Sequence, residues 1–84
     1  MNKDLIIVDD DNIFRDRLSR SMEKKGFLVE SFSDSKSTTR RIREKNFDYA
    51  IVDMRLEDGS GLELLKLIKS INPGTRSLLL TGYG

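Results

Sequence analysis

The sequence predicts a single α/β domain built on a doubly wound parallel β-sheet, with helices on both faces. Four short apolar runs, rich in aliphatic and aromatic residues, have the length and composition of strands. The three segments between them are long enough to be crossover helices, so the element order is βαβαβαβ. A chain of 84 residues has room for one small domain and for no second one.

The four predicted strands are residues 5–8, 27–32, 47–52 and 77–81. The first and the last are almost entirely aliphatic, which is typical of parallel strands that are buried on both faces. Asp9 follows the first strand directly, and Asp53 follows the third. The glycine-containing residues 54–61 after Asp53 are expected to form a loop.

Three helices are predicted between these strands. The first follows residues 9–12, which are of helix-capping types, and shows one apolar face formed by Ile13, Phe14, Leu18 and Met22. The second, residues 33–45, has Ile42 as its only strongly apolar residue. The third, residues 62–71, is strongly apolar and is closed by Asn72-Pro73-Gly74.

The composition excludes several kinds of chemistry. The chain contains no cysteine, which excludes disulfides and metal–thiolate sites, and no histidine, which excludes histidine-based triads and phosphohistidine. A net charge of +1 argues against nucleic-acid binding by bulk charge, and basic residues on the predicted helices are interspersed with acidic ones. Carboxylates, hydroxyls and amines remain for chemistry.

No membrane span or signal peptide is predicted. The apolar runs are far shorter than the roughly 18 residues that a transmembrane helix needs. Residues 1–4 lead directly into the first strand without the features of a signal peptide. We therefore expect a cytoplasmic protein without a membrane partner.

Acidic residues gather at the predicted carboxyl edge of the sheet, where open parallel α/β sheets bind their ligands. Asp9 and Asp10 follow the first strand, Asp53 follows the third, and Thr81 ends the fourth. If the first and third strands are neighbours, about 4.8 Å apart, three carboxylates converge there. Such a cluster is unfavourable unless a cation fills it or some of the acids are protonated, and an all-oxygen site suits Mg²⁺.

A carboxylate in such a site can act as a nucleophile toward phosphorus and form an aspartyl-phosphate. Mg²⁺ beside it would neutralise charge on the transferring phosphoryl group, and Thr81 could donate a hydrogen bond to it. Two plainer interpretations stay open. Residues 9–12 could serve only to cap the first helix, and Asp53 could be a turn residue.

The motifs resemble the receiver domain of bacterial two-component response regulators, which has the CheY-like, flavodoxin-like fold. The resemblance rests on residues 5–11 (LIIVDDD), 51–63 (IVDMRLEDGSGLE) and 78–82 (LLLTG). Three stretches look most like the redox-responsive RegA/PrrA/ActR group, namely residues 21–27 (SMEKKGF), 52–59 (VDMRLEDG) and 80–84 (LTGYG).

The resemblance implies a role for each site residue. Asp53 would accept a phosphoryl group from the phosphohistidine of a sensor histidine kinase or from acetyl phosphate. Asp9 and Asp10 would bind Mg²⁺ together with Asp53, and the backbone carbonyl of Arg55 would complete the protein ligands. Thr81 would be the switch residue that contacts the phosphate. Gly82, being small, would leave the acceptor accessible.

The same resemblance implies a switch rather than an enzyme with its own substrate. Its only activities would be Mg²⁺-dependent self-phosphorylation and self-dephosphorylation. In the full protein the phosphate would control transcription. DNA would be bound through an output domain, a short helix-turn-helix segment in the RegA-like group, that this chain lacks.

The chain departs from the receiver pattern in two ways. Glu57 stands where receivers often have proline, and Ser60 where they often have an acidic residue or asparagine. The sequence also stops after the fourth strand, so the fourth helix, fifth strand and fifth helix are absent. With them goes the lysine that contacts the phosphoryl group, and no lysine of this chain takes its place.

The receiver sheet order 2-1-3-4-5 would be shortened to 2-1-3-4. Residues 78–80 would then lie on an exposed edge, which is a template for pairing with another chain. We therefore expect residues 1–84, the N-terminal portion of a receiver domain, to be unstable alone, to self-associate through this edge, or to belong to a longer protein.

Two alternative functions remain. Residues 5–11 also fit a haloacid-dehalogenase-type phosphatase, with Asp9 as nucleophile and Asp11 as acid/base, although later motifs of that family are lacking. The chain could instead be a non-phosphorylated interaction module that uses the fold as a scaffold. The aspartate that carries phosphate distinguishes these possibilities.

Overall fold

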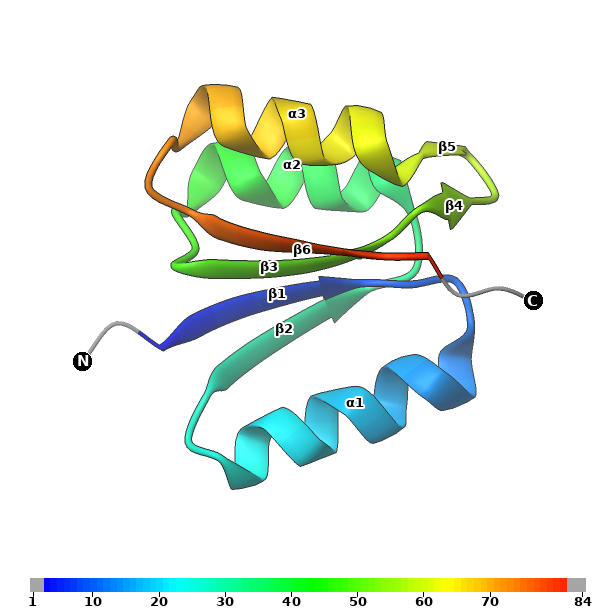
Figure 1. Ribbon diagram of the computed structural model, residues 1–84, viewed down its shortest axis with the longest axis vertical. Helices are drawn as coiled ribbons and strands as arrows, with labels where there is room; N and C mark the ends of the chain where they lie inside the picture. Colours follow the sequence, from blue (N-terminus) through cyan, green and yellow to red (C-terminus); the bar gives the residue numbers. More distant parts are fainter. Residues whose placement is uncertain (1–2, 82–84) are drawn as a thin grey trace.

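A computed structural model describes residues 3–81, which form a parallel sheet flanked by helices (Figure 1). In chain order the elements are β1 (Asp4–Val8), α1 (Asn12–Lys24), β2 (Leu28–Phe32), α2 (Ser35–Glu44), β3 (Tyr49–Asp53), β4 (Arg55–Leu56), β5 (Gly59–Ser60), α3 (Gly61–Ile71) and β6 (Arg76–Leu80). The sheet order is β2-β1-β3-β6, with all neighbours parallel. Because β6 is the fourth long strand, the predicted order 2-1-3-4 is confirmed.

The two faces of the sheet are covered differently. Helices α2 and α3 lie side by side on one face, and α1 lies on the other, against β1 and β2 (Figure 1). This arrangement confirms the doubly wound class. Each helix begins at a polar side chain that accepts a hydrogen bond from a backbone amide of its first turn. These N-cap residues are Asp11, Asp34 and Ser60.

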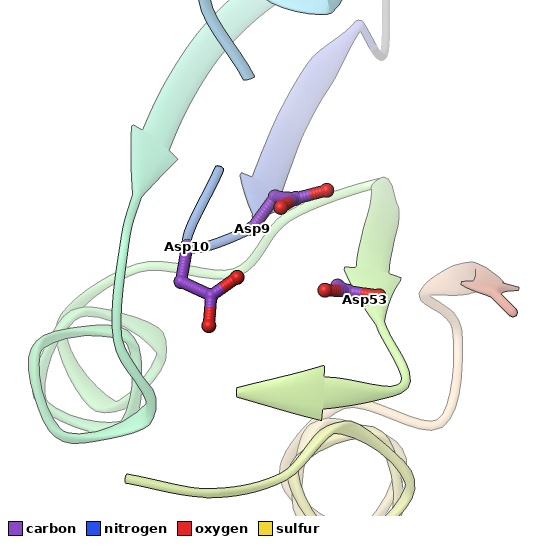
Figure 2. A group of neighbouring side chains, drawn as sticks. All are labelled: Asp9, Asp10 and Asp53. Carbon is purple, nitrogen blue, oxygen red and sulfur yellow. The ribbon is translucent and has the colours of Figure 1, made fainter. Parts of the chain in front are cut away.

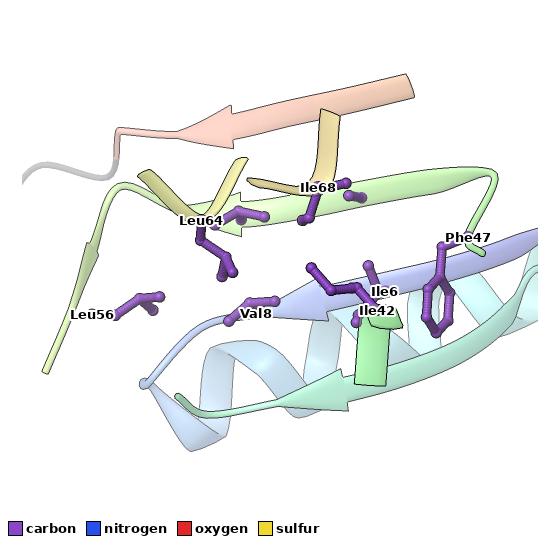
Figure 3. Packing of buried hydrophobic residues seen from close by; sticks show 9 residues of the cluster. Ile6, Val8, Ile42, Phe47, Leu56, Leu64 and Ile68 are labelled. Atoms are coloured by element: carbon purple, nitrogen blue, oxygen red, sulfur yellow. The ribbon is translucent and has the colours of Figure 1, made fainter. Parts of the chain in front are cut away.

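The main hydrophobic core lies between the sheet and the α2–α3 layer (Figure 3). Its buried members come from both strands and helices and are Ile6, Val8, Ile42, Phe47, Ala50, Val52, Leu56, Leu64 and Ile68. Helix α2 contributes Ile42 and also Thr38, which is fully buried because its hydroxyl donates to the carbonyl of Asp34. Because the hydroxyl has this partner, a polar residue can be buried at a position that the apolar pattern did not identify as core.

The opposite face is less completely covered. Leu5 and Ile7 of the central strand β1 are buried there. At the sheet edge Leu78 is 56% exposed. Leu79 points the other way and packs against the core, so the exposed edge expected for residues 78–80 consists chiefly of Leu78.

The segment after Asp53 differs from the predicted loop. Residues 54–61 contain a small hairpin in which Arg55 pairs with Ser60 and Leu56 with Gly59. Leu56 inserts into the core and is 7% exposed, which anchors a segment whose composition alone indicated a turn. The hairpin leads directly from β3 into α3.

The ends of several predicted strands shift by one or two residues. Phe47 lies before β3, where its carbonyl accepts a hydrogen bond from the buried hydroxyl of Thr75 at 2.6 Å. Thr81 follows β6 instead of ending it.

Within residues 3–81, none of the helices combines the length and the apolar character needed to cross a membrane.

Candidate functional site

Three carboxylates meet at the carboxyl edge of the sheet. Val8 of β1 pairs with Val52 of β3, so the residues that follow them, Asp9 and Asp53, stand side by side. Asp10 is next in the chain, and the three side chains gather around one space (Figure 2). One carboxylate oxygen from each lies within 4.8 Å of the others. The convergence expected from the sequence is therefore present in the fold.

Asp9 is the most buried of the three. Only 5% of the residue is exposed, and its amide donates to the carbonyl of Phe32 at 3.1 Å. Its carboxylate accepts a hydrogen bond from the amide of Asp11 at 2.9 Å, and its carbonyl accepts one from the guanidinium of Arg15 at 2.7 Å. The position of Asp9 is thus fixed by β2 and α1 together.

The electrostatics of this group favour a bound cation. Burial raises the pKa of the Asp9 carboxyl, whereas the hydrogen bond from the Asp11 amide lowers it. The negative charges of Asp53 and Asp10 raise the same pKa further. A divalent cation would relieve this repulsion, and an all-oxygen donor set suits Mg²⁺ or Ca²⁺.

The cluster opens into a pocket of about 470 Å³. Its remaining lining comes from Asp11, Phe14, Leu80 and Thr81, and no lysine borders it in the part of the chain that the structure describes. Asp53 is half-buried and faces this space. Of these two lining residues, Asp53 is therefore more accessible to solvent than Asp9, which is 5% exposed.

The end of β6 is joined to the end of β3. The amide of Met54 donates to the carbonyl of Leu80 at 2.8 Å, which sets the exposed Thr81 at the rim of the same pocket. Arg55 begins β4 two residues after Asp53, and the role predicted for its carbonyl stays a prediction. Gly82, also predicted to lie at this site, falls outside the described residues.

The capping interpretation of residues 9–12 applies to one residue of the group. Asp11 is the N-cap of α1, and its carboxylate accepts the amide of Phe14 at 3.0 Å. Asp9 and Asp10 are free of that role and belong to the carboxylate cluster. Asp11, the acid/base of the phosphatase alternative, is therefore engaged in holding the helix.

Two residues near the site were not identified from the sequence. The amide of Gly61 donates to the carbonyl of Met54 at 2.8 Å and lies against the main chain of Asp53. The carboxylate of Asp58, in the turn between β4 and β5, accepts backbone amides at the start of α2. A glycine eight residues after an aspartate is only a weak local signal for the close approach of Gly61 to Asp53. No local pattern predicts the contact between Asp58 and α2.

Comparisons with known proteins identify the family. The family model described as the response regulator receiver domain matches residues 5–84, so the chain belongs to this family. It is 41% identical over 83 residues to the photosynthetic apparatus regulatory protein RegA of Rhodobacter capsulatus. It is also 41% identical over 83 residues to the acid tolerance regulatory protein ActR of Rhizobium meliloti. The predicted likeness to the RegA/ActR group is confirmed, and the phosphatase alternative is not favoured.

The relatives are longer than this chain. The matches cover 99% of the chain but only 45% of RegA and 43% of ActR. Among solved structures, the fold is similar to that of a response regulator from Burkholderia pseudomallei with a phosphorylated aspartic acid, a calcium ion and citrate. That likeness has a TM-score of 0.91 and 29% sequence identity, and covers 98% of this chain and 48% of the other.

Proposed function

We propose that this chain is a phosphoryl-accepting switch whose acceptor is Asp53. Mg²⁺ would be held by Asp9, Asp10 and Asp53, with the carbonyl of Arg55 as a further ligand. The observation that carries the proposal is the convergence of three carboxylates, within 4.8 Å, at the ends of the adjacent strands β1 and β3. The phosphorylated aspartate and calcium ion of the Burkholderia pseudomallei relative support it.

The burial of the two strand-end aspartates favours Asp53 over Asp9 as the acceptor. Both line the pocket, but Asp9 is 5% exposed and already accepts a hydrogen bond from the Asp11 amide, whereas Asp53 is only half-buried. A carboxylate oxygen of Asp53 would attack phosphorus as the P–N bond of the donor phosphohistidine breaks. The bonding electron pair returns to the donor imidazole, which takes up a proton.

Bound Mg²⁺ would supply positive charge against the phosphoryl oxygens. Thr81, at the rim of the pocket, is suited to donate its hydroxyl to one of these oxygens. The same site would support self-phosphorylation from acetyl phosphate and hydrolysis of the aspartyl-phosphate.

A sensor histidine kinase is the proposed donor, and the setting would be cytoplasmic. Because the chain spans less than half the length of RegA and ActR, control of transcription would depend on a further DNA-binding segment. We also propose self-association of this 84-residue chain through β6. The strand lies at the sheet edge, and its Leu78 is 56% exposed.

Two-dimensional amide NMR of the chain tests the function. Spectra are recorded alone, with Mg²⁺, and with Mg²⁺ plus beryllofluoride, which mimics a phosphoryl group. We expect Mg²⁺ to shift the amides of Asp9, Asp10 and Asp53, and beryllofluoride to shift Thr81 as well. Asp53→Asn is the control and should lose the beryllofluoride response. A wild-type spectrum unchanged by both additions contradicts the proposal.

A further inference from the structure

The turn between β4 and β5 is attached to a distant helix by one carboxylate. Oxygens of Asp58 accept hydrogen bonds from the backbone amides of Ser35 at 2.8 Å and Lys36 at 3.1 Å. These partners are 23 and 22 residues away in the chain. The contact therefore joins two loops at the carboxyl edge of the sheet, one after β2 and one after β3.

Asp58 supplies bonds that α2 does not obtain from its own cap. The first amides of a helix have no partner within it. The carboxylate of Asp34, the local N-cap, accepts the amide of Ser37 at 2.9 Å, which lies further along the first turn. The bonds from Ser35 and then Lys36 are the main reasons why the pKa of the Asp58 carboxyl is lowered, so it is ionised at neutral pH. A negative charge at this helix end is also favoured by the helix dipole.

The same turn is closely tied to the proposed metal site. Arg55 starts β4 two residues after Asp53, and Asp58 follows three residues after Arg55. The hairpin is held at one point by the buried side chain of Leu56 and at its base by the bond between Gly61 and Met54. Asp58 attaches the tip of the hairpin to the start of α2.

We propose that Asp58 is a positioning residue for the metal site, which fixes hairpin β4–β5 on the N-terminus of α2 and thereby holds the carbonyl of Arg55 in place. The inference rests on the proposed function, because it assigns Asp58 a role in that same site. It predicts that α2 and the metal site are coupled through one side chain that touches neither the cation nor the acceptor.

The test compares two variants that each remove one carboxylate from the start of α2. Asp58→Ala removes the bonds to Ser35 and Lys36, whereas Asp34→Ala removes the bond to Ser37 and does not touch the hairpin. Mg²⁺ is titrated into the full chain, and the dissociation constant is measured from the amide shift of Asp10. Melting temperatures are recorded for the same samples.

We expect Asp58→Ala to weaken Mg²⁺ binding about tenfold, as found when residues that orient metal ligands are removed. Asp34→Ala should lower the melting temperature by about as much as Asp58→Ala does, and it should leave Mg²⁺ binding unchanged. If Asp58→Ala does not fold, Asp58→Asn, which keeps the size of the side chain but not its charge, is judged by the same criterion.

Two results overturn the inference. Unchanged Mg²⁺ binding in the Asp58 variants would limit Asp58 to capping the helix. Equal weakening by Asp34→Ala would show that any loss of α2 stability is sufficient. Both results leave the proposed function intact if the wild-type chain binds Mg²⁺. A wild-type chain that does not bind Mg²⁺ overturns the proposed function and this inference together.

Discussion

The backbone of Gly61 lies so close to Asp53 that a Cβ atom at position 61 would overlap the carbonyl oxygen of Asp53. Gly61 also begins α3, and its amide donates to the carbonyl of Met54. The start of α3 is thus packed directly against the backbone that carries the proposed phosphoryl acceptor. Only the absence of a side chain permits this approach.

Gly61→Ala is therefore expected to be strongly destabilising. The new methyl group meets main-chain atoms, which cannot move aside without shifting β3, so the cost should be about 3 kcal/mol or more. Chemical denaturation measures it. Gly74→Ala is the matched control, because a Cβ atom there meets only the side chain of Asn72, at 3.4 Å. Equal costs for the two variants would refute the close approach.

Asp53→Asn should stabilise the metal-free chain. Removing one of three converging negative charges relieves repulsion by about 1 kcal/mol, the Coulomb energy expected for solvated charges at this separation. Thermal melts without Mg²⁺ measure the gain. In wild type, Mg²⁺ should raise the melting temperature by mass action, and the variant should gain less from it. A variant less stable than wild type in the absence of Mg²⁺ would argue against a shared site.

The raised pKa of Asp9 predicts an unusual pH dependence in the metal-free state. A carboxyl whose pKa is higher in the folded state than its ordinary value of 3.8 favours folding when protonated. That contribution is present at low pH and is lost as the pH rises through the folded-state pKa. Asp9→Asn should therefore match wild type near pH 3 and exceed its stability at neutral pH. Denaturation across this range, with Mg²⁺ chelated, makes the comparison.

If the stability difference between Asp9→Asn and wild type stays the same at every pH, the carboxyl of Asp9 does not carry a raised pKa. A difference that disappears when Mg²⁺ is added would agree with the account, because the cation compensates the same charge.

The ion pair between Glu30 of β2 and Arg41 of α2 predicts that stability depends on pH in the opposite direction from the Asp9 case. Two bonds of 2.7 and 3.0 Å to the Arg41 guanidinium lower the pKa of Glu30. The stabilisation is present above the ordinary Glu pKa of 4.5 and is lost as the pH falls through the folded-state value. Glu30→Gln should cost about 1 kcal/mol at neutral pH, since both side chains are partly exposed.

The matched control for this pair is Glu63→Gln. Glu63 pairs with Lys66 at 3.6 Å on the surface of α3, where both side chains are largely exposed, so its removal should change stability little. Urea denaturation at pH 7 compares the two variants. Equal effects would mean that the Glu30–Arg41 pair contributes no more than an ordinary surface pair.

Leu78→Lys should reduce self-association of the chain. A charge at this exposed position opposes pairing of the β6 edge with a second copy and leaves the core unaltered. Sedimentation velocity over a range of concentrations measures the change. Leu28→Lys, at 64% exposure on the opposite edge strand β2, is the control and should associate like wild type. A wild-type chain that stays monomeric throughout would remove this proposal.

The parallel sheet and the location of the aspartates at its carboxyl edge were predictable from the same pattern. Apolar runs that end in aspartate mark the carboxyl ends of buried strands, and a parallel sheet brings these ends together. The pattern therefore predicts that Asp9, Asp10 and Asp53 lie at one edge of the sheet. The resemblance to receiver domains supplied the neighbouring placement of β1 and β3 that the pattern left conditional.

Contacts between distant loops could not be predicted in this way. Asp58 and Ser35 are joined by a hydrogen bond across 23 residues, and neither position departs from ordinary turn or cap composition. The hairpin β4–β5 depends on the burial of Leu56 in a core whose other members include residues of β1, α2, β3 and α3. No local pattern of apolar residues around Leu56 indicates this burial. The hydroxyl of Thr38 bonds to the N-cap residue of its own helix, which allows this polar residue to be buried. The pattern of apolar residues does not identify such a position.

The most direct measurement locates the phosphoryl group after reaction with acetyl phosphate and Mg²⁺. Wild type, Asp53→Asn and Asp9→Asn are incubated in parallel, and intact-mass spectrometry followed by reductive cleavage of the acyl phosphate identifies the modified aspartate. We predict a single phosphoryl group on Asp53, absent from Asp53→Asn and reduced in Asp9→Asn through loss of a metal ligand. Phosphate on Asp9, or full labelling of Asp53→Asn, would contradict the account.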